Sequence, residues 1–140
     1  MSDNVKEKVL AILQPMQTVM LATCSEGKPY VRPMILIYHQ ERFFFASGTA
    51  DAKARQVAEN PNAEMCLYFE KADSSGYVRA AGKLETINDP ATRSEIHQVA
   101  KFIQNYFPTP DDPGFALYQM HWQTVEYMKP RQSQTETIDW

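Results

Sequence analysis

Hydrophobic and polar residues alternate along most of this chain with the two-residue period of β-strands, and a helical period occurs in only three places. The alternation and the β-branched or aromatic content predict six strands, at residues 18–24, 30–39, 43–46, 64–70, 76–87 and 115–128. Short turns separate them, and Gly27 stands where a positive φ is easiest. The chain is therefore predicted to be rich in antiparallel hairpins.

Three helices are expected in addition to these strands. Apolar residues at three- and four-residue steps from Val5 predict a first helix that ends near Pro15. Asp51 is a candidate N-cap for a short helix over residues 52–59, and Asp89-Pro90 is a strong helix start. The polar residues 131–140 are predicted to form a loosely held tail, with the terminal Trp140 left open as an exception.

This order of elements argues against a parallel α/β fold. The strands do not alternate regularly with helices, and the chain contains no Gly-x-Gly-x-x-Gly or Walker-type loop. Antiparallel hairpins with a few helices over the open ends of a barrel fit better. We therefore expect a mainly β fold, an antiparallel split β-barrel with α-helices, as one domain over residues 1–140.

Composition narrows the functional classes. The chain has 140 residues, of which 44% are hydrophobic, and a formal net charge of −3. That charge gives no basic surface for nucleic acid or an anionic membrane, and no apolar run approaches the roughly 18–20 residues of a membrane span. The N-terminus lacks a signal-peptide profile, and two cysteines without metal spacing favour reduced thiols. A cytoplasmic protein is expected.

One stretch carries candidate chemistry. Arg32 lies on the second predicted strand, and the turn Ser47-Gly48-Thr49 precedes Lys53 at the mouth of the second helix. A cation on a strand, free backbone N–H groups and a lysine at a helix N-terminus suit a phosphate monoester. The alternative is that Arg32 and Lys53 are ordinary surface charges and that the turn is only a helix cap.

Several short motifs in this order resemble the FMN-binding split barrels of the pyridoxamine 5'-phosphate oxidase-like family, in particular its short general-stress-protein-like subset. The resemblance runs from about Val19 to Asp89 and rests on Leu21-Ala-Thr, Gly27-Lys-Pro-Tyr-Val-Arg-Pro, Phe45-Ala-Ser-Gly-Thr with Lys53, and Gly76-Tyr-Val-Arg-Ala-Ala-Gly82. It implies a homodimer with two FMN sites at the interface, each built from both subunits.

The resemblance also implies site residues. Arg32 and Lys53 would bind the FMN phosphate, the Ser47 turn would meet the phosphate or ribityl chain, and Tyr77 would approach the flavin. Met34 and Ile35 would line the flavin edge through their backbone. The full set of implied cofactor-binding residues is Arg32, Pro33, Met34, Ile35, Ser47, Gly48, Thr49, Lys53 and Tyr77. For Tyr77, a cation–aromatic pair with Arg79 and no ligand is the alternative.

The chain departs from the family oxidases in three ways. Ile37 stands where they commonly carry a second lysine, and Ala52 replaces an arginine that often precedes the phosphate lysine. The C-terminal segment that completes their vitamin-B6 pocket is also missing. These departures argue against vitamin-B6 oxidation.

Three functions remain open at this point. The first is a flavin-dependent oxidoreductase in which hydride passes between a nicotinamide or another small molecule and the flavin. The second is an FMN carrier or sensor without turnover. The third is a split barrel that uses F420 or haem, and haem would need an axial ligand such as His121. No catalytic side chain is named, and the scattered histidines predict no metal site.

The dimer expectation has a reason of its own in the sequence. Five aromatic residues are expected to leave an exposed apolar face that a second copy would cover. They are Tyr106, Phe107, Phe115, Tyr118 and Trp122.

Overall fold

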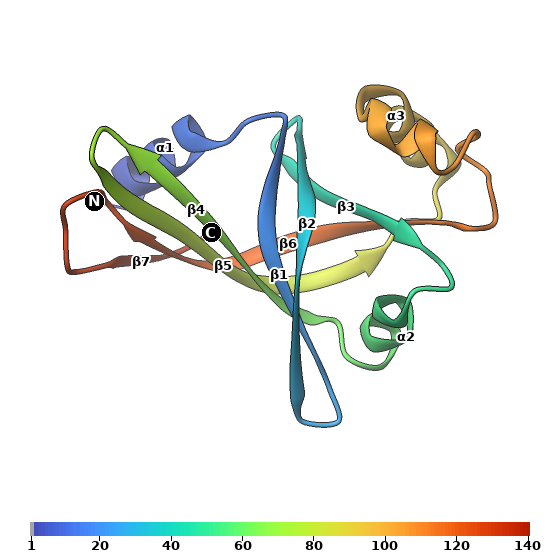
Figure 1. The fold of residues 1–140 in the computed structure, drawn as a ribbon, viewed down its shortest axis with the longest axis horizontal. Helices are drawn as coiled ribbons and strands as arrows, with labels where there is room; N and C mark the ends of the chain where they lie inside the picture. Colours follow the sequence, from blue (N-terminus) through green and yellow to red (C-terminus); the bar gives the residue numbers. More distant parts are fainter. Residues whose placement is uncertain (1) are drawn as a thin grey trace.

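The computed structural model describes residues 2–140 as a strand-rich fold with helices toward the two ends of the molecule (Figure 1). The strands are β1 (Met16–Ser25), β2 (Lys28–His39), β3 (Arg42–Gly48), β4 (Asn62–Lys71), β5 (Ser74–Thr86), β6 (Phe115–Met128) and β7 (Glu136–Asp139). The helices are α1 (Ser2–Ile12), α2 (Ala52–Glu59), α3 (Pro90–Val99) and a short 3-10 helix, η1 (Lys101–Asn105). Among these residues, no helix is long and apolar enough to cross a membrane.

All strand pairs are antiparallel, and the sheet has the order β3-β2-β1-β4-β5-β6-β7. The edge strand β3 also pairs with β6, from Phe43 opposite Met120 to Gly48 opposite Phe115. This pairing joins the two ends of a six-stranded sheet, so the barrel is closed and its edge strands are protected. The predicted mainly β split barrel with α-helices is confirmed.

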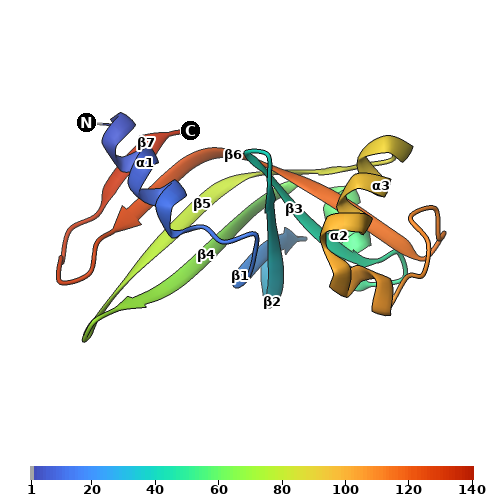
Figure 2. The same cartoon turned by 90° about the horizontal axis from the view of Figure 1, so that it is seen from above.

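Two apolar clusters hold the barrel and its helices together. The larger one fills the barrel, where Phe43 and Trp122 stack with their ring centroids 3.7 Å apart. The smaller one lies outside β2 and β3 and packs Ile37 and Phe44 against Ile96 of α3. Figures 1 and 2 place α1 at one end of the molecule and α2 and α3 toward the other. The helix start at Asp89 is confirmed, because its carboxylate accepts a hydrogen bond from the Thr92 amide.

One glycine is required by the way β5 passes β6. The pairing register shifts between Ala81, which pairs with Thr124, and Gly82, which pairs with Trp122, so β6 has a bulge at Gln123. A Cβ atom on Gly82 would lie 2.0 Å from the His121 carbonyl oxygen. Only glycine therefore permits this close approach of the two backbones.

The prediction of a loosely held tail at residues 131–140 is wrong for its second half. Residues 136–139 form β7, which pairs with β6, and Ile138 is buried. The Trp140 ring packs edge-on against Trp122, with centroids 5.0 Å apart. Ile138 and Trp140, separated by one polar residue, are enough to form the buried face of this edge strand. The prediction missed them because most of the segment is polar.

The expected exposed aromatic face is also wrong. Phe115, Tyr118 and Trp122 are all buried within this chain, and Phe107 is half-buried and stacks on Phe115. Of the five aromatic residues only Tyr106 is exposed. The reason is topological: β6 lies between β3 and β5 in the closed barrel, so its aromatic residues fill the chain's own core.

Candidate functional site

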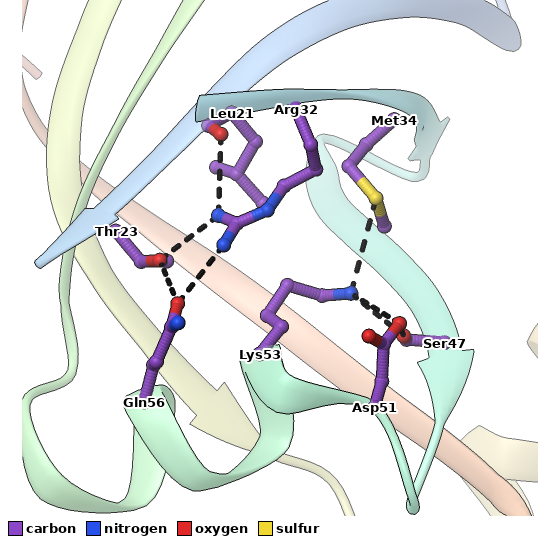
Figure 3. A network of polar contacts seen from close by, with 8 residues as sticks. All are labelled: Leu21, Thr23, Arg32, Met34, Ser47, Asp51, Lys53 and Gln56. Carbon is purple, nitrogen blue, oxygen red and sulfur yellow. Dashed lines mark hydrogen bonds and ion pairs between the residues drawn. The ribbon is translucent and has the colours of Figure 1, made fainter. Parts of the chain in front are cut away.

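A cluster of polar side chains lies where α2 meets β1, β2 and β3 (Figure 3). Arg32 and Met34 point from alternate positions of β2 toward α2, and Ser47 comes from the end of β3. Lys53 and Gln56 are three residues apart and therefore share one face of α2. We call the set Arg32, Ser47, Asp51, Lys53, Gln56 and Thr23 the α2 cluster.

Lys53 is the most unusual member of this cluster because its charged end is buried. Its side chain is only 3% exposed. Its ammonium donates to Ser47 Oγ at 2.6 Å and to Met34 Sδ at 3.8 Å, and it lies 3.7 Å from Asp51 Oδ2. Burial lowers the pKa of Lys53 below its ordinary value, and the Asp51 carboxylate opposes that shift.

Arg32 is held by neutral acceptors. Its Nη1 donates to Thr23 Oγ1 at 2.9 Å and to the Leu21 carbonyl at 3.3 Å, and its Nη2 donates to Gln56 Oε1 at 2.9 Å. Burial lowers the pKa of Arg32, and the Asp51 charge again acts in the opposite direction. These acceptors carry no negative charge, so they fix the orientation of the guanidinium without neutralising it.

Asp51 is the acidic member of the cluster. Its Oδ2 accepts a hydrogen bond from Ser47 Oγ at 2.9 Å, and this contact holds the pKa of Asp51 below its ordinary value. Arg32 and Lys53 are the two cations of the cluster and Asp51 is its one carboxylate, so the cluster carries a net positive charge. The Asp51 side chain is 54% exposed, so the cluster opens to solvent on that side.

Four of the nine residues predicted for the site converge on this cluster: Arg32, Met34, Ser47 and Lys53. Pro33 and Ile35 lie on the other face of β2, where Ile35 packs against the smaller core cluster. Gly48 ends β3.

Two more predicted residues point elsewhere. Thr49 Oγ1 donates to the Pro113 carbonyl at 3.1 Å, so this hydroxyl faces the loop before β6. The Tyr77 hydroxyl on β5 lies 3.4 Å from Glu126 Oε1, and the Arg79 guanidinium stands 6.0 Å from the centre of the Tyr77 ring. The cation–aromatic pair considered for Tyr77 is therefore present.

The sequence did not assign Thr23, Asp51 and Gln56 to a site. Thr23 needed the strand register, because Leu21 pairs with Arg32 and Thr23 follows on the same face. Gln56 could have been found from the sequence, because its three-residue spacing from Lys53 places both side chains on one face of the helix. The two departures from the family pattern remain departures in the structure, since Ile37 is buried in the smaller core cluster and Ala52 supplies no charge.

A large hollow lies away from this cluster. It has a volume of about 860 Å³ and lies between α1, the β4–β5 hairpin and the end of β6. Its cations are in part already paired on the surface, Lys129 with Glu136 and Arg131 with Asp73. The α2 cluster, with its buried Lys53 and its oriented Arg32, is the stronger candidate for an anionic ligand.

Comparison with known proteins identifies the family. A model of the pyridoxamine 5'-phosphate oxidase family matches residues 5–129. The chain belongs to this family. General stress protein 26 of Bacillus subtilis (strain 168) is 25% identical over 126 residues, which cover 89% of each chain.

Solved structures show the same fold. The General Stress Protein 26 from Bacillus anthracis str. Sterne superposes with a TM-score of 0.79 at 22% identity, covering 98% of this chain and 99% of that one. A heme binding protein from Mycobacterium smegmatis superposes with a TM-score of 0.71 at 16% identity, covering 89% of this chain and 53% of that one. The fold of the pyridoxamine 5'-phosphate oxidase family thus also occurs in a heme binding protein.

The buried ammonium has a measurable cost. We expect Lys53→Met to raise the free energy of unfolding at neutral pH by about 1 kcal/mol, because methionine retains the packing and needs no desolvated charge. Since the folded-state pKa of Lys53 is lowered, the unfolded chain binds more protons between that pKa and the ordinary one. The Lys53 contribution to stability therefore rises with pH in that interval, and the variant should lack this rise.

Denaturant unfolding at pH 7 and near pH 10 measures both effects. Lys101→Met, at an exposed lysine of η1, is the control and should change neither. A variant Lys53→Met that is clearly less stable than the wild type at pH 7 would show that the ammonium stabilises the fold.

Proposed function

We propose that this protein is an FMN-binding flavoprotein whose α2 cluster binds the phosphate of the cofactor. The supporting observation is the buried Lys53 ammonium, which meets Ser47 at the N-terminus of α2 while Arg32 arrives from β2. Two cations, a hydroxyl and the first amides of a helix are the groups that bind a phosphate dianion. Family membership and the resemblance of the binding motifs support the same choice of cofactor.

We further propose that the protein is a flavin-dependent oxidoreductase that acts on a small molecule. The flavin, when bound, supplies the hydride chemistry. The protein would hold the phosphate through Arg32, Ser47 and Lys53, and the backbone of β2 at Met34 and Ile35 would line the flavin edge. Three of the other implied residues lie next to these groups in the sequence: Pro33 on β2, and Gly48 and Thr49 directly after Ser47. We assign no side chain as acid or base.

The absorption spectrum of the purified protein tests the cofactor. Bound oxidised flavin should give two bands, at about 370 and 450 nm. Anaerobic reduction of the bound flavin by NADH or NADPH would then favour the oxidoreductase, whereas flavin that binds but is not reduced would favour a carrier or sensor.

Haem is the second candidate, because a heme binding protein shares this fold. The imidazole proposed as axial ligand, His121, lies on the outer side of β6 and its Nε2 is 2.8 Å from Glu85 Oε1. It is half exposed and is not part of the α2 cluster. An intense Soret band in place of the flavin bands would support haem.

We also propose that two copies associate through the outer face of β1, β2 and β4. The strand register sets Met20 beside Pro33 and Cys66, with Val31 and Tyr68 at diagonal positions. Met20, Val31 and Tyr68 are 49%, 69% and 62% exposed, an apolar group that a second copy would cover.

Light scattering should return twice the chain mass of 16.1 kDa at micromolar concentration. Val31→Asp should shift the protein toward monomer, whereas Tyr106→Asp, at an exposed aromatic residue outside this face, should not. A wild-type mass near 16.1 kDa would rule the association out.

The phosphate assignment predicts a difference between two flavins. Lys53→Ala should lower FMN affinity ten- to a hundredfold, or about 1.5–3 kcal/mol, and should leave riboflavin affinity nearly unchanged because riboflavin has no phosphate. Isothermal titration of both ligands measures this. Arg55→Ala, which removes an exposed cation of the same helix, is the matched control. Equal losses for both ligands on Lys53→Ala would mean that Lys53 supports the fold only.

A further inference from the structure

Asp51 occupies the N-cap position of α2 without capping the helix. Its backbone is extended, with φ −70° and ψ 145°, as an N-cap requires, yet its carboxylate makes no capping hydrogen bond. Aspartate is among the most favoured N-caps because its carboxylate accepts from amides of the first helical turn. The carboxylate turns instead to Ser47 and Lys53 (Figure 3). A second favourable position for this side chain is therefore available and is not used.

The position that Asp51 does use conflicts with a phosphate. Ser47 has one hydroxyl proton, and it is donated to Asp51 Oδ2. The Lys53 ammonium lies 3.7 Å from the same oxygen. A phosphate bound by Ser47 and Lys53 would need that proton and that ammonium, and it would meet a carboxylate of like charge a few ångströms away.

We propose that Asp51 is an internal competitor for the phosphate and a determinant of ligand specificity. In the arrangement described above, its carboxylate holds Ser47 and Lys53 in the place of the phosphate. Phosphate binding releases it, and it then turns to cap α2. The choice of FMN as ligand rests on the proposed function. The competition between the Asp51 carboxylate and a phosphate for Ser47 and Lys53 would apply to any phosphate ligand.

The geometry allows this exchange. The Asp51 side chain is 54% exposed, so it is free to turn on its solvent side, while the buried Lys53 stays in place. The gain of a helix cap offsets part of the lost contact with Lys53. The remaining cost reduces the preference of this chain for phosphorylated over unphosphorylated ligands, compared with a site that has the same cations and no acid.

Removing the charge alone tests the proposal. Asp51→Asn keeps the size and the capping ability of the side chain and loses its charge. We expect FMN affinity to rise about tenfold, as for the loss of one like-charge contact in a partly desolvated site, and riboflavin affinity to stay within about twofold. Asp51→Ser, which also caps, should act in the same direction. Glu7→Gln, at an exposed acid of α1, is the control for net charge.

A second measurement does not depend on the flavin. Inorganic phosphate should raise the melting temperature of Asp51→Asn more than that of the wild type, each compared with its own value without phosphate. Because each protein is its own reference, the difference in basal melting temperature between the two proteins is subtracted.

The outcomes separate this proposal from the proposed function. Tighter FMN binding and a larger phosphate shift in both Asp51 variants support both. FMN binding to the wild type with no gain in either variant overturns the role of Asp51 and leaves the flavin function standing. A larger phosphate shift without FMN binding to any form keeps the role of Asp51 and overturns the flavin function. No FMN binding and equal phosphate shifts overturn both.

Discussion

The ammonium of Lys53 is taken out of water near the open end of a β-barrel, and the arrangement around it follows from that constraint. A buried charge costs several kcal/mol unless polar groups surround it. Ser47 from β3, Met34 from β2 and Asp51 before α2 provide that surrounding. These residues are distant in sequence, and the antiparallel order of β1, β2 and β3 with α2 against β1 brings them together. The site thus depends on the closure of the barrel.

The sequence predicts a site or core residue correctly where the evidence for it lies in neighbouring positions, and misses it where the evidence depends on strand pairing. Arg32, Ser47 and Lys53 were found because residue type and spacing alone suggest an anion site. Thr23 was missed because its role needs the register of β1 with β2. The aromatic residues of β6 were placed on the surface because alternation shows that a strand has two faces and does not show which other strand covers each one. Ile138 was missed because four residues of an edge strand give too short a pattern.

Family membership and the chain's own residues contribute different parts of the account. The match over residues 5–129 establishes the family and, with the structure, the split barrel. The proposed phosphate site rests instead on the chain's own residues. Here the two positions at which the oxidases commonly carry further cations hold a buried Ile37 and an uncharged Ala52. The carboxylate of Asp51 lies 3.7 Å from the Lys53 ammonium. The anion binding that we propose for this chain would therefore depend on a few groups in fixed places.

The pKa of Lys53 with and without ligand tests the central claim most directly. It can be followed by NMR of the labelled lysine side chain during a pH titration. Without ligand, the account predicts a Lys53 pKa below the ordinary value, since burial dominates. Bound FMN should raise it, because a dianion close to the ammonium favours the charged form, while bound riboflavin should not. A pKa of Lys53 that is the same with FMN, with riboflavin and without ligand would contradict the assignment of the α2 cluster as a phosphate site.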